Sequence, residues 1–393
     1  HLHDQRPAGI YPATGVLNDG ADKGLSRRDL LAGVGAAGLA LAPGAGALPR
    51  NQVRAWDIFT DVLVVGSGAA GACAAIEARA AGAAVLLLES MPRFGGASAM
   101  SAGVVYAGAG TSLQRALSIE DSVEAMYDFI VAAGGAHQQL DKVRLYCEQS
   151  PEHFDWLFEQ GIPYKAALSE ARGVPTGEES LYYSGDERSR ALSERARPAP
   201  RGHVPAVPGV NGGREMMRFL LQQAGEAGAD MRARATARQL FVESDGRIAG
   251  AVVDIEGERR VIRARRGVGL AAGGFIHNRD MLRRHAPELY ACAVPWDNSA
   301  NLGAGIGMGV AAGGEALRMH QGYTVAPIYP PERALSGILV NALGQRFVAE
   351  DAYHAVLGHA ITYNQGGRAW LITDHESALP DGQDNFRAVA RAN

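Results

Sequence analysis

Apolar positions along the chain follow two patterns that together predict an α/β fold. Residues 61–65 and 84–88 are short apolar runs of the kind found in buried parallel strands. Between them, residues 69–81 are rich in alanine and predict a helix, so the three segments form a β-α-β unit. Apolar residues recur at helical spacing over 118–160 and again over 214–224.

A second group of strands is expected further along the chain, at 238–243, 248–254, 259–264 and 267–271. Gly246 and Gly257 mark the turns of the intervening hairpins. The segment 166–212 differs, since it is rich in Pro, Gly, Ser and Arg and has no periodicity. Loops of this length are usually functional or disordered. Because Tyr182 and Tyr183 give it an aromatic anchor, we favour a lid or a wall of a substrate site over a plain linker.

Composition narrows the class of protein. The 393 residues are 47% hydrophobic, enough for one large domain or two ordinary ones. The net charge of −4 and the absence of a basic patch argue against a nucleic-acid partner. Three distant cysteines, Cys73, Cys147 and Cys292, suggest neither a disulfide framework nor a metal site. We therefore expect buried structural thiols and no bound metal.

The first 50 residues resemble an export signal or tail. Arg27 and Arg28 precede a short apolar run that ends near Ala42, and Ala45-Gly46-Ala47 matches a small-residue cleavage pattern. Paired arginines indicate the twin-arginine route to the periplasm or cell envelope. The apolar run is shorter than the ~20 residues of a membrane span, so no stable span is expected. The alternative is a disordered Ala/Gly-rich tail on a cytoplasmic protein.

The first strand and helix of the β-α-β unit are joined by Gly66, Gly68 and Gly71, a G-x-G-x-x-G turn. The first glycine allows the tight turn, the second lets the backbone approach a pyrophosphate, and the third lets the helix pack on the strand. The pyrophosphate then lies at the helix N-terminus, where the dipole favours negative charge. Glu89 ends the second strand and suits an adenosine ribose. Together these features predict a bound dinucleotide.

Three further segments favour a flavin over a nicotinamide dinucleotide. A glycine- and serine-rich loop at 94–103 follows Glu89 closely and could contact the far half of a larger cofactor. Residues 267–274 form an apolar run that ends in small residues, as expected for a strand returning beside the adenosine. Residues 303–309 open another helix without a bulky side chain.

This set of segments, from about Asp61 to Asp374, resembles the FAD-dependent fumarate reductase/succinate dehydrogenase flavoprotein-like superfamily, which includes the 3-ketosteroid dehydrogenases. The resemblance implies a Rossmann-like FAD-binding domain at 57–318 with a helical and loop insertion at about 110–212. An α+β capping domain for the substrate would begin at 319, with 319–393 forming a part of it. The FAD contacts implied are Gly66, Gly68, Ala69, Gly71, Glu89, Ser90, Gly95, Gly96, Ser98, Ser101, Gly103, Ala237, Ala272 and Gly273.

Within this superfamily the proton-transfer residue distinguishes the reactions. Reductases of fumarate and urocanate usually carry His-Pro-Thr near the cap entry and an arginine soon after G-x-R-F-x-x-E. Here residues 320–324 are His-Gln-Gly-Tyr-Thr, and the stretch Gly344–Glu350 is followed by Tyr353 instead of arginine. The local sequence is most similar to that of the 3-oxosteroid 4-dehydrogenases, with parallels at 101–111, 183–185, 198–203, 329–332 and 337–341.

The resemblance therefore implies a hydrophobic ketone, a 3-ketosteroid, as substrate. Tyr353 would take the C4 proton while hydride passes from C5 to the flavin. Because a free tyrosine has a pKa of about 10, it needs a neighbour that lowers its pKa or passes the proton on. His354 is adjacent in sequence, and Tyr329 and Tyr323 are further candidates for the site wall. The electron acceptor and the exact steroid stay open.

Members of the superfamily close over the flavin with a later glycine-rich segment, and residues 375–393 contain none. We therefore expect a truncated cap, weak FAD binding and slow turnover. Two alternatives remain at this point. One is an exported flavin-dependent reductase of an unsaturated acid, and the other is an inactive remnant of a flavoprotein.

Overall fold

A computed structural model of the chain describes residues 46–134, 138–171, 173–292, 295, 297–326 and 337–373. By their contacts these residues all belong to one unit, residues 43–393. The twin-arginine motif, Tyr329 and residues 375–393 lie outside the described residues. No helix in the described part of the chain is both long and apolar enough to cross a bilayer.

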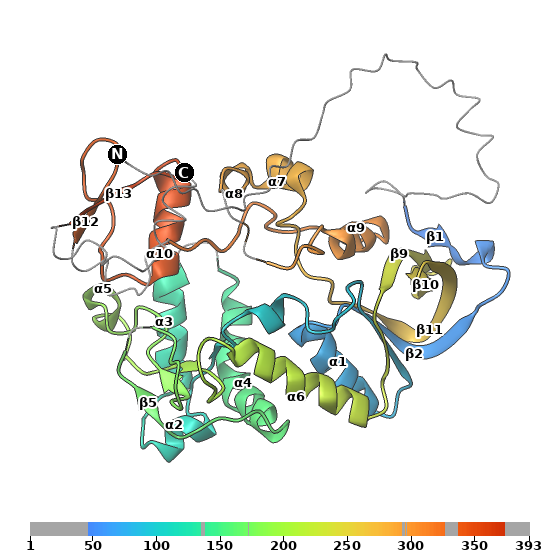
Figure 1. Cartoon of the computed structure of the whole chain (residues 1–393), viewed down its shortest axis with the longest axis horizontal. Coiled ribbons are helices and arrows are strands. Elements are labelled where there is room, and N and C mark those ends of the chain that lie inside the picture. The colour runs from blue at the N-terminus through green and yellow to red at the C-terminus, as the bar shows by residue number, and fades with distance from the viewer. Residues whose placement is uncertain are drawn as a thin grey trace, which may run out of the picture. The chain divides into compact units, whose positions relative to one another are not determined.

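A seven-stranded sheet carries the β-α-β unit (Figure 1). β2 (Ile58–Val65) lies between β11 (Glu258–Leu270) and β3 (Val85–Leu88) and is parallel to both, and β8 (Asp230–Arg232) extends the parallel part beyond β3. On the other side of β11, β10 (Ile248–Ile255) and β9 (Ala235–Val242) pair antiparallel, and β1 (Leu48–Pro49) completes the sheet. The strands predicted at 61–65, 84–88, 238–243 and 248–254 are thus confirmed.

One strand differs from expectation. Residues 259–264 and 267–271 were expected as two strands, but β11 runs through both. Its register against β2 shifts between Ala264 and Gly267, which is where the sequence pattern breaks. The turns at Gly246 and Gly257 both have positive φ, as tight hairpins require.

Side chains of β2 and β3 point alternately to two buried faces. Val64 and Leu87 pack against α1 (Ala69–Ala80) and α6 (Gly212–Glu226), which contact each other on one face (Figure 1). Leu63 and Leu86 face the opposite side, where Met308 of α9 (Ala304–Ala311) contributes to the core. Burial on both faces explains the continuous apolar runs in these strands.

The insertion contains α2 (Ser112–Ala116), α3 (Val123–Gly134), α4 (Leu140–Glu159) and α5 (Arg190–Ser193). Three of its strands join β4 (Val105–Tyr106), which lies just before the insertion, in a small sheet in the order β4, β7 (Gly202–His203), β6 (Leu181–Tyr182) and β5 (Leu168–Ser169). The expectation of one irregular segment over 166–212 is therefore wrong in part. These two-residue strands are too short to produce a periodic pattern, but Tyr182 is buried as the aromatic anchor.

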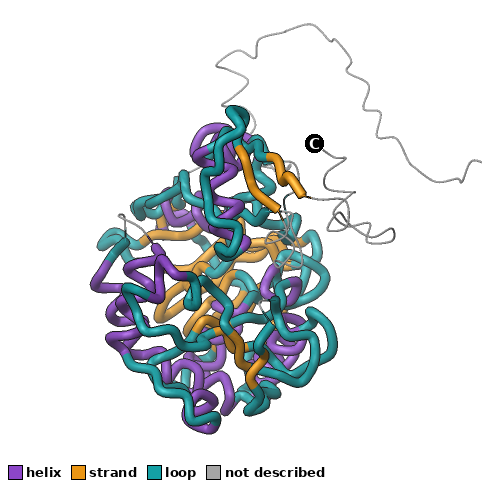
Figure 2. Tube along the Cα trace, turned by 90° about the vertical axis from the view of Figure 1, so that its left-hand side faces the viewer, coloured by secondary structure: helices purple, strands orange, loops and turns teal. Residues whose placement is uncertain are grey.

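The residues expected to start the cap form a small core of their own around Ala326, Leu339 and Leu357. Here β12 (Gly337–Val340) pairs with β13 (Trp370–Thr373) in a separate sheet (Figure 2). α10 (His354–His359) continues into a π-helical turn at Ala360–Asn364. The short helices α7 (Arg279–His285) and α8 (Pro287–Tyr290) precede α9. The domain boundary at 318–319 stays a prediction.

The cysteines are all free, and the described residues hold no cluster able to bind a metal. Cys147 is buried, whereas Cys73 and Cys292 are partly exposed. The expectation of buried thiols thus holds fully only for Cys147.

Candidate functional site

The first glycine turn has the geometry that its sequence predicts. Gly66 has a φ of +103°, and a Cβ there would lie 2.3 Å from the carbonyl oxygen of Ala271. A Cβ on Gly71 would lie 1.8 Å from the carbonyl oxygen of Gly66. Neither position can therefore carry a side chain. The turn is held between the end of β11 and the first turn of α1.

Gly71→Ala is expected to lower the FAD content well below that of the wild type, because the added methyl group must push α1 away from the turn at Gly66. The measurement is the ratio of flavin to protein, from absorbance after purification with FAD. Gly225→Ala in α6 is the matched control, since its new methyl group meets only Met231 Sδ at 3.9 Å. A Gly71→Ala protein that purifies with the wild-type flavin content would contradict this role.

The second loop folds directly onto the first. Ser98 Oγ accepts a hydrogen bond from the backbone N–H of Ala69, at 3.1 Å. A Cβ on Gly96 would lie 3.4 Å from Gly68 Cα. Gly95 donates its N–H to Ser67 Oγ, at 3.0 Å. The nearest glycines of the two segments, Gly71 and Gly95, are 24 residues apart in the sequence. The two segments nevertheless form one surface.

Glu89 joins these loops at the end of β3. Its buried carboxylate accepts hydrogen bonds from Ser67 Oγ at 2.6 Å and from the Met91 N–H at 2.9 Å. The acid thus lies where a ribose is expected, and in this structure it also fixes both glycine loops through Ser67. Its contact with a ribose stays a prediction.

Gly212 and Gly213, which the sequence motifs did not include, pack against the second loop. Gly213 donates its N–H to the carbonyl of Ser101, at 3.1 Å, and a Cβ on Gly103 would lie 2.3 Å from the carbonyl carbon of Gly212. Both glycines begin α6, so this helix packs directly on the loop. A Gly-Gly pair at the start of an amphipathic helix is the sequence signal that could have indicated this close packing.

The later predicted contacts approach the same turn. Ala271 donates its N–H to Val65, so Ala272 and Gly273 follow β11 past Gly66. Gly273 has a φ of +71°, and a Cβ there would lie 2.2 Å from Asn301 Oδ1. β9 begins where β3 ends, because Ala235 donates its N–H to the carbonyl of Glu89, at 2.8 Å. Ala237 therefore lies near the end of β3, as expected for a neighbour of the adenine.

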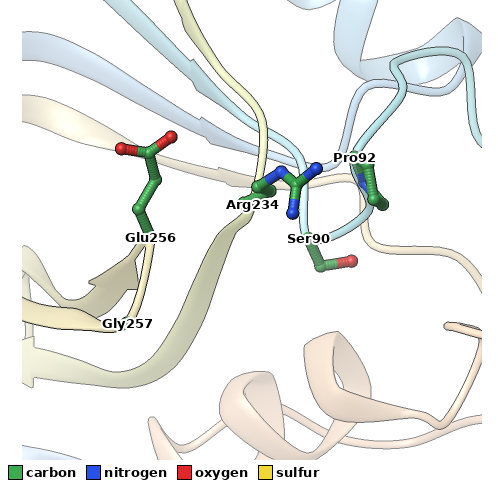
Figure 3. A pocket seen from close by; sticks show the side chains of 5 residues that line it. All are labelled: Ser90, Pro92, Arg234, Glu256 and Gly257. Atoms are coloured by element: carbon green, nitrogen blue, oxygen red, sulfur yellow. The ribbon is translucent and has the colours of Figure 1, made fainter.

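A cavity of about 690 Å³ opens beside Glu89, lined by Ser90, Pro92, Arg234, Glu256 and Gly257 (Figure 3). The guanidinium of Arg234 points toward Ser90 and Pro92, while Glu256 stands on the β10–β11 turn (Figure 3). This places an open, polar space next to the acid expected to hold the ribose. The sequence predicts the adenosine end of the dinucleotide at this place.

The N-terminus of α1 suits a pyrophosphate. Gly68 has no side chain to cap the helix, and although Ser98 Oγ accepts the Ala69 N–H, the N–H of the exposed Ala70 has no acceptor among the described residues. An anion at this point would satisfy the free N–H and meet the positive end of the helix dipole. With the glycines and Glu89, these residues fit FAD.

The tyrosines of the cap form a pair. The hydroxyls of Tyr323 and Tyr353 lie 3.3 Å apart, and the rings of Tyr353 and His354 are 4.1 Å apart at a tilt of 53°. Ala326 donates its N–H to the His354 carbonyl, at 3.0 Å. A Cβ on Gly358 would lie 2.6 Å from the Thr324 carbonyl oxygen. The segment that follows Tyr323 is thus held against α10, and Gly358, which the sequence did not single out, permits this close approach.

Of the two expected ways to make Tyr353 a proton acceptor, a neighbour that lowers its pKa or one that passes the proton on, the electrostatics do not support the first. Burial raises the pKa of Tyr353 well above its ordinary value, and the hydrogen bond with Tyr323 raises it further. Burial also lowers the pKa of His354, whose Nδ1 has no partner among the described residues. The phenol of Tyr353 is therefore neutral at pH 7. Since Tyr323 is 69% exposed, a proton can reach solvent through it.

A family model described as an FAD binding domain matches residues 61–388. The chain belongs to this family of FAD-binding flavoproteins. The flavoprotein is 31% identical over 369 residues to a 3-oxo-5-alpha-steroid 4-dehydrogenase of Comamonas testosteroni, covering 81% of this chain and 68% of the relative. It is 29% identical over 327 residues to a probable fumarate reductase of Shewanella frigidimarina, covering 81% of this chain and 51% of the relative.

Among solved structures, the flavoprotein matches a 3-ketosteroid-Δ4-(5α)-dehydrogenase of Rhodococcus jostii RHA1 in complex with 4-androstene-3,17-dione. The TM-score is 0.80 and the identity 37%, over 85% of this chain and 70% of that one. The open conformation of a flavocytochrome c3 fumarate reductase gives a TM-score of 0.65 at 26% identity, over 86% and 59%. These matches confirm the α/β flavoprotein fold and FAD as the cofactor, and make the chain an FAD-dependent oxidoreductase.

Beside the tyrosine pair, the insertion encloses charged residues that sequence analysis did not single out. Arg201 is fully buried and pairs with Asp121 through Nη2–Oδ1 at 2.7 Å and Nε–Oδ2 at 2.9 Å. Glu187 is buried near Arg201, and the half-buried Tyr106 places its phenol oxygen in the same interior; neither Glu187 Oε1 nor this phenol oxygen has a partner among the described residues. Burial raises the pKa of Glu187 and of Tyr106, so both favour the neutral form.

His203 makes this flavoprotein sensitive to acid. Its ring is buried against Phe154, and burial lowers its pKa to about 4 from the ordinary 6.5. A depressed folded-state pKa contributes stability that is present above pH 6.5 and lost as pH falls toward 4. The loss expected for this one group is about 3 kcal/mol.

The measurement is the free energy of unfolding by urea between pH 7 and 4, for wild type and His203→Gln. The wild type is expected to lose about 3 kcal/mol more than the variant over this range. Parallel pH curves for the two proteins would show that His203 does not titrate in this way.

Proposed function

We propose that this flavoprotein oxidises a saturated 3-oxosteroid to the corresponding C4–C5 unsaturated ketone. The observation that carries the proposal is the pair of hydrogen-bonded phenols at Tyr353 and Tyr323. In the sequence pattern, Tyr353 stands where reductases of unsaturated acids have an arginine. The relatives named as 3-oxosteroid dehydrogenases support the same substrate class.

Bound FAD supplies the two-electron acceptor that such an oxidation needs. The residues that fit it are those of the two glycine loops, Glu89, and the Ala272–Gly273 turn. The chain's own part in the chemistry is the movement of one proton, from C4 of the substrate to water.

Tyr353 would accept the C4 proton on its phenol oxygen as its own proton passes to Tyr323, and Tyr323 would release a proton to solvent. This relay leaves both side chains unchanged and needs no tyrosinate. It therefore suits a Tyr353 whose pKa is raised by burial. The 3.3 Å between the hydroxyls and the exposure of Tyr323 support this direction of transfer.

The same surroundings suit a neutral ketone better than a dicarboxylate. In the described part of the cap, Arg346 is ion-paired with Glu350, whose Oε1 also accepts the Leu339 N–H at 2.8 Å. This arginine is thus committed to holding β12. Apolar walls with a few hydroxyls are typical of sites for hydrophobic ligands.

The test uses the purified chain loaded with FAD under anaerobic conditions. Addition of 5α-androstane-3,17-dione is expected to bleach the oxidised-flavin absorbance, whereas 4-androstene-3,17-dione, which already has the double bond, should not. In the reverse experiment, fumarate should fail to reoxidise the dithionite-reduced protein. Reoxidation by fumarate without bleaching by the steroid would replace this proposal with the acid-reductase alternative.

A further inference from the structure

Tyr353 is held by a carboxylate from a distant part of the chain. Its backbone N–H donates a hydrogen bond to Oδ1 of Asp186, which lies 167 residues earlier in the sequence. Asp186 belongs to the insertion, in the connection between β6 and α5, whereas Tyr353 precedes α10. This contact therefore links the insertion to the residue that carries the proposed proton transfer.

Several contacts fix the segment that carries Asp186. Arg188 forms an ion pair with Glu170 at 2.8 Å, and its guanidinium lies 3.6 Å from the centre of the Tyr183 ring. Ser189 donates its N–H to the carbonyl of Asp186, at 2.8 Å. The carboxylate is thus presented from a turn that is braced by contacts within the insertion.

The adjacent Glu187 strengthens this bracing. Its side chain is fully buried, and Oε2 accepts the N–H of Gly185 at 2.9 Å, so it anchors the turn in the interior. Glu187 and Tyr182 also lie within electrostatic range of the Tyr353 phenol. One turn of the insertion therefore supplies both the contact to the Tyr353 backbone and part of the surroundings of its side chain.

The phenol of Tyr353 needs this support because its hydroxyl must lie within hydrogen-bond reach of Tyr323. The remaining backbone contacts of Tyr353 are to α10 itself, through its carbonyl to Val356 and Leu357. These bonds fix Tyr353 relative to α10 only. Asp186 is the described side chain that fixes it relative to the insertion.

We propose that Asp186 is a positioning residue for Tyr353, which it holds by its backbone so that the phenol can pass its proton to Tyr323. The effect on kcat rests on the proposed function. The position of Tyr353, by contrast, can be measured without steroid oxidation. Displacement of a reacting group by about 1 Å can cost on the order of 100-fold in rate.

Asp186→Ala is expected to lower kcat by roughly 10- to 100-fold with KM for the steroid nearly unchanged, because the ketone's binding surface is not altered. Asp186→Asn retains an acceptor oxygen and should recover kcat to within about threefold. Asp245→Ala, which removes an exposed carboxylate from the β9–β10 turn, is the control for loss of charge. Equal losses in the Ala and Asn variants would overturn the proposal.

A double variant separates positioning from general support of the fold. If Asp186 acts through the Tyr353 hydroxyl, adding Asp186→Ala to Tyr353→Phe should lower kcat by less than about twofold more. A further loss as large as that of the single variant would show that Asp186 acts in some other way.

A measurement without substrate separates this inference from the proposed function. Tyr353 is replaced by 3-fluorotyrosine, and the ¹⁹F resonance of the FAD-loaded protein is compared among wild type, Asp186→Ala and Asp186→Asn. A changed or broadened resonance in the Ala variant alone supports positioning, even if no steroid is oxidised. An identical resonance in all three proteins overturns the positioning role and leaves the proposed function standing.

Discussion

Asp121→Ala is expected to lower the free energy of unfolding by about 3–5 kcal/mol. The variant leaves the guanidinium of Arg201 fully buried without its charged partner. An isolated buried charge costs far more than a surface one, because little solvent or protein dipole replaces its hydration. This is among the largest effects that a single substitution outside the flavin site can have here.

The contacts of Asp121 explain why the loss should reach this size. Besides Arg201, its Oδ2 accepts the Ala109 N–H at 2.9 Å and Gln114 Nε2 at 3.2 Å. A Cβ on Gly108 would lie 2.6 Å from the same oxygen. The carboxylate thus connects the loop before α2 with Arg201 just before β7, and its removal leaves several buried donors unsatisfied.

The measurement is chemical unfolding at pH 7, followed by circular dichroism. The double variant Asp121→Ala/Arg201→Met should recover much of the lost stability, since it removes the unpaired charge. Asp245→Ala, whose partner Arg247 is exposed, should cost less than about 1 kcal/mol. A loss below about 1 kcal/mol for Asp121→Ala would mean that Glu187 ionises and neutralises Arg201 in its place.

The flavin half of the molecule could be predicted from the sequence because its signals are local. Gly66, Gly68 and Gly71 adjoin the strand and helix that they connect, and each has a backbone reason to be glycine. The apolar runs of β2 and β3 likewise report burial on both faces. Glu89 could be placed because it ends the next strand.

The insertion could not be predicted in the same way, because its determinants are distant in the sequence. Asp121 and Arg201 lie 80 residues apart, and Arg201 stands in a stretch of prolines and arginines that resembles an exposed loop. The strands that enclose it are two residues long, so no alternation is visible. Nothing in the local sequence distinguishes buried Arg201 from exposed Arg190 or Arg195.

The tyrosine pair could be predicted in part, less fully than the flavin site and more fully than the insertion. Tyr353 could be singled out because it follows a recognisable stretch of sequence, and Tyr323 because it lies near the expected cap entry. Their distance and the raised pKa of Tyr353 depend on how closely residues 324–326 approach Gly358. The sequence therefore predicted the residues of the pair but left open whether the pKa of Tyr353 is lowered or its proton is passed on, and the raised pKa favours the second.

Tyr353→Phe is expected to lower the rate of steroid oxidation by roughly 10²- to 10⁴-fold, the usual contribution of a positioned proton-transfer group. The FAD content should be unchanged, because none of the residues that fit the cofactor contacts this hydroxyl. The variant keeps the ring, so its packing against His354 is retained. The loss should appear in kcat rather than in KM, because the hydroxyl acts in the proton-transfer step.

The measurement is single-turnover bleaching of the flavin by 5α-androstane-3,17-dione, in wild type, Tyr353→Phe and Tyr323→Phe. Tyr323→Phe should be less impaired, because water can replace the exposed second member of a relay more easily than the half-buried first one. Tyr127→Phe in α3, where the ring stacks on Arg144, is the matched control and should react at the wild-type rate. If Tyr353→Phe bleaches as fast as wild type, the proton leaves by another route. If instead Tyr323→Phe shows the larger loss, the order of the two tyrosines in the relay is reversed, and Tyr323 is the residue that meets the substrate.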